Sequence, residues 1–406
     1  MPQTTDIGTG ARIAAYRRMH HLTQRGLAAK ANVSYSLLSK VESGHAPASA
    51  ALTAACARVL QVPVTVLNGQ PYATDHANDR LDGPLSDLRA SLDNWDLALD
   101  VPVRSLDEIG ADVRKLVSAR RSANFTKIVS AVPPLIDELV QLSQTLTGHA
   151  QEMAHHHLVQ VYRSAHDVAY GLGLTDLAAL LRDRMEFSTR RAGDPYLMSL
   201  YHYMRAQSTF STGRHEVGQR IVDIARDEIA DGVSAGCRAA ICAAGNLNLR
   251  ASILHTRQGN GDGAREALGE ARRLARALGD QEVTGTSANG QHVMSFGPTN
   301  VGIHAAAIEV ELGKYGQALK LAKAVHMPDG YPPDRIGHHW IDTARAQLAT
   351  GKNDAALTSL LKARTAAPQQ AKYHPSVRET VAGLIHAARH TPETLVGYAS
   401  WVGVQL

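Results

Sequence analysis

Polar side chains suited to contact nucleic acid are concentrated in residues 23–44, which read TQRGLAAKANVSYSLLSKVESG. Two short amphipathic segments lie here on either side of the turn 31–33, where Asn32 tolerates the left-handed conformation that a tight corner needs. Thr23 and Ser34 are suited to cap the two predicted helices. The spacing therefore predicts a helix-turn-helix, a motif that places its second helix in the DNA major groove.

The second predicted helix has two different faces. Leu37, Leu38 and Val41 form an apolar side that is expected to face the core. The opposite side is polar and consists of Tyr35, Ser36, Ser39 and Lys40. Side chains of these types can hydrogen-bond to base edges, so this face is the predicted reading surface.

Further helices on both sides complete the unit. Residues 10–22 predict an amphipathic helix, Ser49 is suited to cap an apolar helix that reaches Leu60, and a last turn at 63–67 closes the unit. The order of these elements resembles the DNA-binding domain of phage-repressor-like (XRE-type) transcription factors. The resemblance implies a five-helix domain that binds double-stranded DNA.

The resemblance also implies roles for individual residues. Gln24 matches a glutamine that contacts a DNA phosphate, and Arg17 and Glu42 match a buried structural pair that ties the first helix to the recognition helix. The chain departs from the family at Arg25 and Gly26, where acidic or small polar residues are usual; glycine costs the helix about 1 kcal/mol relative to alanine. The residues predicted to contact DNA are Gln24, Arg25, Ser34, Tyr35, Ser36, Ser39 and Lys40.

Length and charge fit this interpretation. A chain of 406 residues is too long for one ordinary core and predicts two or three domains. Aromatic residues make up only 5%, and the abundance of Ala and Leu favours helices. Residues 1–70 contain seven Lys and Arg side chains against two acidic ones, so the net charge of +4 is concentrated where DNA is expected to bind.

No pattern typical of catalysis or metal binding is present. Cys56, Cys237 and Cys242 have neither metal-ligand nor disulfide spacing. The histidine runs, of which His155–His157 is the longest, lack a third ligand at helical spacing, and we expect solvated or singly hydrogen-bonded rings there. We therefore predict no enzyme activity, no metal and no cofactor. The lack of a signal peptide or membrane-spanning pattern predicts a cytoplasmic protein.

The rest of the chain predicts an all-α fold, with no alternating strand pattern after residue 84. Long amphipathic helices end repeatedly at a glycine that is followed by a short turn and a small residue. The copies begin at Gly173, Gly213, Gly313 and Gly351, with a looser copy at Gly261. This pattern resembles the hairpins of tetratricopeptide-like α-solenoids, although the spacings are longer than in a regular repeat.

These observations predict four segments. They are a helix-turn-helix DNA-binding domain at 1–69, a turn-rich linker at 70–84, a helical connecting region or start of the solenoid at 85–147, and a repeat domain for sensing and dimerisation at 148–406. Within the third segment, helices are expected at 105–121 and 133–146, with Pro133 and Pro134 at the start of the second.

Candidate ligand contacts come from the first helix of each hairpin, which lines the concave surface in repeats of this kind. Asn amides can grip a peptide backbone, while Arg and His bind carboxylates. The long loop 285–300 is either a simple interhelical loop held by a buried Phe296, with Met294 beside it, or the rim of the ligand site. The ligand-binding residues predicted in this way are Tyr201, Arg205, Asn246, Arg250, Phe296, Asn300, His304, His339 and Trp340. Each of them could equally be an ordinary solvated or interhelical polar group.

The two parts together are similar to the peptide-sensing, quorum-sensing regulators of Gram-positive bacteria. The resemblance implies a homodimeric transcription regulator that binds an operator and whose solenoid senses a peptide or a small molecule. The alternative is a regulator whose solenoid binds only protein, either its dimer partner or an antagonist polypeptide.

Overall fold

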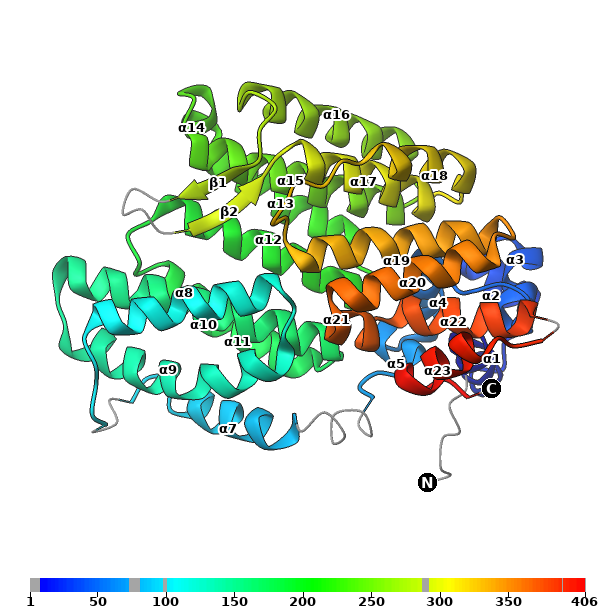
Figure 1. The fold of residues 1–406 in the computed structure, drawn as a ribbon, viewed down its shortest axis with the longest axis horizontal. Helices are drawn as coiled ribbons and strands as arrows, with labels where there is room; N and C mark the ends of the chain where they lie inside the picture. Colours follow the sequence, from blue (N-terminus) through cyan, green and yellow to red (C-terminus); the bar gives the residue numbers. More distant parts are fainter. Residues whose placement is uncertain (1–7, 73–80, 98–100, 287–291, 389, 406) are drawn as a thin grey trace.

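The computed structural model describes residues 8–405 apart from 73–80, 98–100, 287–291 and 389. Almost all regular structure in these residues is helical (Figure 1), and the predicted all-α fold class, a helix-turn-helix domain followed by helical hairpins, is confirmed. The first five helices pack around their own apolar core, which includes Ile13, Leu27, Leu38 and Leu60. We call this unit the head; its helices are α1 (Thr9–Met19), α2 (Gln24–Ala31), α3 (Tyr35–Glu42), α4 (Ala50–Leu60) and α5 (Val64–Asn68).

The remaining helices form the body, which begins with α7 (Asp82–Asp93), α8 (Leu106–Arg121) and α9 (Phe125–Thr145). Five antiparallel hairpins follow, and each pairs an inner with an outer helix. They are α10 (Gly148–Leu172) with α11 (Thr175–Thr189), α12 (Pro195–Thr212) with α13 (His215–Glu228), α15 (Arg238–Arg257) with α16 (Gly261–Ala277), α17 (Pro298–Glu311) with α18 (Tyr315–Ala324), and α19 (Pro333–Ala349) with α20 (Asn353–Ala366). The short α14 (Ala230–Ser234) precedes α15, and the chain ends with α21 (Pro368–Tyr373), α22 (Pro375–Ala387) and α23 (Glu393–Val402).

Glycines make the hairpin turns, as the sequence pattern indicates. Gly173, Gly213, Gly313 and Gly351 all have φ between 67° and 79°, a backbone conformation that costs other residues a steric penalty. The looser copy turns at Gly259, also at positive φ, two residues before the glycine that the pattern suggested. The small residues that follow these turns are buried or closely packed, which lets the second helix approach the first.

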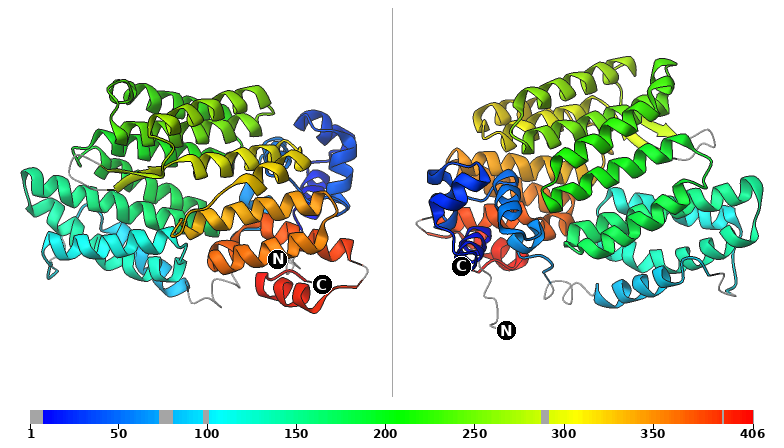
Figure 2. Two further views of the ribbon diagram at one scale, coloured as in Figure 1. Left: turned by 45° about the horizontal axis from the view of Figure 1, so that its top comes forward. Right: turned by 180° about the vertical axis from the view of Figure 1, so that it is seen from behind.

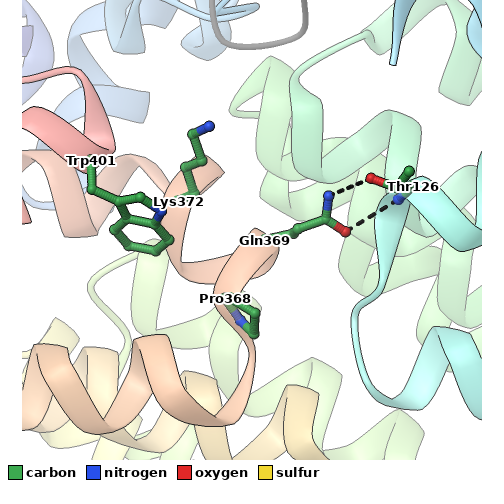
Figure 3. Close-up of a pocket in the computed structure, with 5 residues that line it drawn as sticks. All are labelled: Thr126, Pro368, Gln369, Lys372 and Trp401. Atoms are coloured by element: carbon green, nitrogen blue, oxygen red, sulfur yellow. Dashed lines mark hydrogen bonds between the residues drawn. The ribbon is translucent and has the colours of Figure 1, made fainter. Parts of the chain in front are cut away.

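The body closes on itself because its first helices meet its last ones (Figure 1). The backbone N–H of Thr126, in the first turn of α9, donates to Gln369 Oε1 at 3.1 Å, and Gln369 Nε2 donates to Thr126 Oγ1 at 2.7 Å (Figure 3). The rings of Phe125 and Tyr373 stack beside this pair at 6.1 Å. A surface cavity of about 200 Å³ next to the junction is lined by Thr126, Pro368, Gln369, Lys372 and Trp401.

The head lies on the outside of the body, as the view from behind shows (Figure 2, right). Helices α4 and α5 contact α12, and α4 also contacts α15. At the other end of the body the backbone N–H of Thr9 donates to Glu379 on α22, and the Arg378 guanidinium lies 3.5 Å from the centre of the Tyr72 ring. The head is therefore attached both to the middle and to the end of the helical row.

Two local expectations were wrong. A strand pair interrupts the helices, because β1 (Val283–Thr286) and β2 (His292–Phe296) form an antiparallel hairpin that packs on α15. Its strands are too short for an alternating pattern to be recognised, and part of the loop lies outside the described residues. Pro133 and Pro134 lie inside α9 and do not start a helix. The apolar residues on both sides of them are buried on one continuous face, so packing outweighs the local cost of proline.

Candidate DNA-binding and effector sites

The recognition helix α3 is held at both ends by short polar contacts. Ser34 is its N-cap and accepts a hydrogen bond from the backbone N–H of Leu37 at 3.2 Å. Ser43, just after the helix, donates its hydroxyl to the carbonyl of Ser39 at 2.9 Å. Leu38 and Val41 anchor the inner face in the core of the head. The local sequence thus fixes the axis of the helix, and packing fixes its rotation.

The outer face of α3 is open to solvent, as a DNA-reading helix requires. Ser34, Ser36 and Lys40 are exposed, Tyr35 is 46% exposed, and Ser39 is half-buried. Leu37 was expected in the core, but it is 42% exposed. The turn from α2 into α3 rotates the helix so that Leu38 and Val41 alone fill the space against α1 and α2.

Three side chains from three helices meet behind the recognition helix. Arg17 Nε and Nη2 donate to the two carboxylate oxygens of Glu42 at 2.7 and 2.9 Å, and Gln24 Nε2 donates to Glu42 Oε2 at 2.8 Å. The Glu42 side chain is only 3% exposed, and its hydrogen bonds raise the pKa of Arg17. Arg17 Nη1 also donates to the carbonyl of Leu22 at 2.7 Å. α1, α2 and α3 are thereby joined around one carboxylate.

Two of the predicted DNA contacts lie next to each other on the surface of the head. Arg25 is exposed, and its guanidinium lies 5.4 Å from the centre of the Tyr35 ring. Gln24 is half-buried, and its amide turns toward Glu42. The contact between Arg25 and Tyr35 shows that the start of α2 lies beside the start of α3. The predicted phosphate and base contacts therefore share one side of the head.

The inner helices of the hairpins present polar stripes to the inside of the body. On α19 the stripe has helical spacing and consists of Arg335, His338, Asp342 and Arg345. It faces α17, because Arg345 Nη1 lies 2.8 Å from Glu311 Oε1 and 2.9 Å from Asp342 Oδ1. The electrostatic neighbours of His304 on α17 include Arg335 and Arg250, and those of Arg163 on α10 include Tyr203 and Arg335. Inner helices far apart in the sequence therefore share this space, which we call the inner face.

Only some of the predicted ligand contacts lie on the inner face. Arg250 and His304 are half-buried there, and His304 Nδ1 donates to the carbonyl of Asn300 at 2.9 Å. Tyr201 is buried toward α11 and donates to Glu186 at 2.5 Å, and Arg205 is exposed on the same turn of α12. The inner residues of α12 are instead Tyr203, which the Arg250 guanidinium contacts, and Phe210.

On α19, too, the residues predicted to bind ligand are not the ones that face the inside of the body. His339 is buried, and Trp340 lies against Lys362 of α20, with the ammonium 4.2 Å from the ring centre. Trp340 therefore packs within its own hairpin, and the His339 ring lies beside it. The neighbouring positions Arg335, His338, Asp342 and Arg345 carry the inner stripe, and their three-and-four spacing is a signal that the sequence did contain.

A buried amide relay connects the strand hairpin with the inner face. Asn246 Nδ2 donates to the carbonyls of Cys242 and Ser295, at 2.8 and 3.0 Å. Asn300 Nδ2 donates to Asn246 Oδ1 at 3.4 Å, and Asn300 Oδ1 accepts a hydrogen bond from Arg335. Asn246 and Asn300 are both buried, so their amides hold secondary-structure elements together.

The rim predicted at 285–300 borders a cavity. Phe296 is fully buried against α15, where a Cβ at Gly245 would lie 2.4 Å from its ring. A cavity of about 140 Å³ lies between the strand hairpin, the 328–332 loop and the ends of α8 and α19. Its lining combines polar and apolar surface, and the polar residues include Arg121, Glu282, Thr284, Asn300, Tyr331 and Arg335. Arg335 lines this cavity and also belongs to the polar stripe of α19, so the cavity adjoins the inner face.

The histidines in the described part of the chain do not form a metal site. Among the residues that the structure describes, no group of His, Cys, Asp and Glu could hold a metal ion. His155, His156 and His157, expected to be solvated or singly hydrogen-bonded, are buried, and burial lowers the pKa of each to about 4. α10 is covered on several sides by α8, α9 and α11, so adjacent positions are all enclosed. No described helix has the length and apolar character needed to cross a membrane.

Comparison with known proteins supports the assignment of the head. A family model described as helix-turn-helix matches residues 13–67. No curated protein matches the chain. Among solved structures, the chain is similar to PlcR of Bacillus thuringiensis in its complex with the peptide PapR7 and DNA, at 14% identity and a TM-score of 0.28, over 67% of this chain and 95% of that chain. The head belongs to the family that the sequence resembles, the helix-turn-helix DNA-binding domain of XRE-type transcription regulators.

Proposed function

We propose that the protein is a transcription regulator that binds a palindromic operator as a homodimer and responds to a peptide or small polar effector bound in the body. The observation that carries the proposal is the orientation of the head: the polar face of α3 points to solvent, while α4 and α5 contact the body. Such an arrangement leaves the reading surface free and couples the rest of the head to the helical row.

A dimer is part of the proposal because one recognition helix contacts too few base pairs for operator specificity. The effector site we favour is the inner face with its adjoining cavity, where Arg250, His304, Asn300 and Arg335 come together. An effector that changes the curvature of the body would move the head, because the head contacts both α12 and α22.

The DNA part of the proposal is tested with operator DNA selected from genomic fragments. Lys40→Ala and Tyr35→Ala should each weaken operator binding by about 1–3 kcal/mol if each side chain contacts a base. Lys320→Ala, which removes an exposed ammonium on α18, is the matched control and should bind like the parent. Unchanged operator binding by Lys40→Ala would refute the assignment of α3.

The effector part is tested by measuring operator affinity with and without extract from the source culture. The parent should change affinity, whereas Asn300→Ala should keep its basal affinity and lose the response. An identical response from the variant would exclude the amide relay from signalling.

A second candidate has one observation in its favour. Val217 and Ile224, seven residues apart on the outer helix α13, are 46% and 51% exposed. Two apolar side chains on one outer face favour a protein partner, either a second copy of the chain or an antagonist polypeptide. Copurification distinguishes the candidates, since a retained small ligand supports the first and a stoichiometric partner protein supports the second.

A further inference from the structure

Two arginines on α15 project toward the inner face one above the other. Arg250 and Arg257 are seven residues apart, which places them on the same side of the helix with a separation of about 10 Å along its axis. The Arg250 guanidinium lies 4.1 Å from the centre of the Tyr203 ring, and that of Arg257 lies 4.1 Å from the centre of the Phe210 ring. Stacking on an aromatic ring orients a guanidinium but leaves its charge unneutralised.

The carboxylates nearby are already engaged with other arginines. Glu311 and Asp342 both pair with Arg345, and Asp167 pairs with Arg120 at 3.4 Å, while Arg257 attracts Glu311 only at longer range. Within the described part of the chain, neither Arg250 nor Arg257 has a carboxylate within ion-pair distance. The Nε atoms of both are buried and lack a hydrogen-bond partner there.

Arg335 adds a third positive charge. Its Nη1 donates a hydrogen bond to the neutral amide oxygen of Asn300, while Glu282 and Asp334 act on it only through longer-range attraction. Arg250, Arg257 and Arg335 are all half-buried, so part of each side chain is exposed to solvent. In the described part of the chain, these three arginines thus have no carboxylate within ion-pair distance, and Arg335 also lines the cavity beside the strand hairpin.

Burial and neighbouring arginines both act on the titratable groups around this surface, although the pKa of Arg335 itself is raised because its burial is outweighed by Tyr331 and Asp334. Burial and the charges of Arg335 and Arg250 lower the pKa of His304 to about 3. Burial together with Arg120 lowers the pKa of Arg163 to about 9, despite the opposing effect of Asp167. The pKa of His338 is also lowered, by burial and then by Arg335 and Arg250, against the attraction of Asp342 and Asp334. A concave surface lined by several positively charged side chains concentrates anions.

We propose that the inner face binds an anionic effector through Arg250, Arg257 and Arg335, and that this effector carries at least two negatively charged groups set close together, because the guanidinium groups of Arg250 and Arg257 lie 5.3 and 4.1 Å from the centre of the same Phe210 ring. Carboxylates and phosphates both match the planar donor fork of arginine. The spacing suits acidic residues two apart in an extended peptide, which point to the same side at a distance of about 6–7 Å. It also suits a small molecule with a phosphate at each end. The inference rests on the proposed effector function and specifies the charge of the effector.

The test measures binding by calorimetry with the full chain and no DNA. Tetraglutamate and fructose 1,6-bisphosphate are the two charged probes, and tetraglutamine and fructose are their neutral counterparts. We expect one charged probe to bind with a stoichiometry of one per chain, and which one it is distinguishes an acidic peptide from a bisphosphate. The neutral counterparts should not bind. Rising ionic strength should weaken binding of the charged probe to the parent protein.

Two variants assign the binding to these residues. The double variant Arg250→Gln with Arg257→Gln should bind the charged probe at least about 100-fold more weakly, or about ten-fold per lost charged hydrogen bond. Arg272→Gln, which removes an exposed arginine on the outer helix α16, should bind like the parent. The proposal is overturned if neither charged probe binds, if neutral and charged probes bind alike, or if the double variant binds normally.

The salt dependence keeps the test decisive if the double variant does not fold, because salt-independent binding by the parent also overturns the proposal. Failure here is distinct from failure of effector sensing. A neutral effector would still change operator affinity in the extract experiment, whereas a bound anion that leaves operator affinity unchanged would contradict sensing and leave the anion site standing.

Discussion

Arg17 and Glu42 form a two-point ion pair that ties the first helix of the head to the end of its recognition helix, with N–O distances of 2.7 and 2.9 Å. Glu42 is almost fully enclosed, and Gln24 adds a third hydrogen bond to it. The orientation of the reading surface therefore depends on a contact that does not itself face DNA.

This pair leads to the first prediction. Removing one partner leaves the other charge buried, so Arg17→Met or Glu42→Leu should each destabilise the head by about 3–5 kcal/mol. The double replacement should recover much of that loss. Urea unfolding followed by circular dichroism measures the cycle, and single variants that melt with the parent would show that the pair contributes little.

The hairpin turns provide a matched pair of glycine substitutions. Gly313 has φ of +72°, so Gly313→Ala should destabilise the body by about 1–2 kcal/mol. Gly316 lies in the first turn of α18 with open space around its Cα, so Gly316→Ala should stabilise it by about 0.5–1 kcal/mol. Thermal unfolding of the two variants should give shifts of opposite sign. Shifts of the same sign would contradict the assigned backbone conformations.

The amide relay is expected to hold the strand hairpin on α15. Asn246→Ala leaves the Ser295 carbonyl and the Asn300 amide without this partner and should cost about 1–3 kcal/mol. Amide hydrogens of β1 and β2 should then exchange faster. Asn248, whose amide donates to Ala244 within the same helix, is the control. Asn248→Ala should leave exchange in the hairpin unchanged, and equal effects of both variants would argue against the relay.

Buried histidines predict a loss of stability in mild acid. Burial lowers the folded-state pKa of His155, His156 and His157 to about 4, against about 6.5 in an unfolded chain. The unfolded state therefore takes up protons first, so this contribution is complete above pH 6.5 and is lost progressively as the pH falls toward 4.

Unfolding measured between pH 7.5 and 5 checks this expectation. His156→Gln should reduce the slope of stability against pH by up to about one proton below pH 6.5. His149→Gln, which changes an exposed ring near the start of α10, is the control and should keep the parent slope. A stability independent of pH over this range would contradict the burial of these rings.

The sequence alone determined the fold class and the features that local chemistry specifies. Ser34 and Ser49 cap α3 and α4 because a hydroxyl at that position satisfies free N–H groups. Gly173 and Gly351 turn the chain because their positive φ is accessible mainly to glycine. The helix-turn-helix could be recognised because its caps, turn and apolar spacing all occur within a short segment, which a family model matches as well.

Tertiary structure decided which side of each helix faces the inside of the body. Each residue along a helix turns the side chain by about 100°, so Tyr203 and His338 lie on the inner face while Tyr201, two positions away, contacts Glu186 on α11 and His339, one position away, is buried. The meeting of Thr126 with Gln369 depends on how many small rotations accumulate along the row of hairpins. Contacts of that kind join residues far apart in the chain, and no local pattern specifies them.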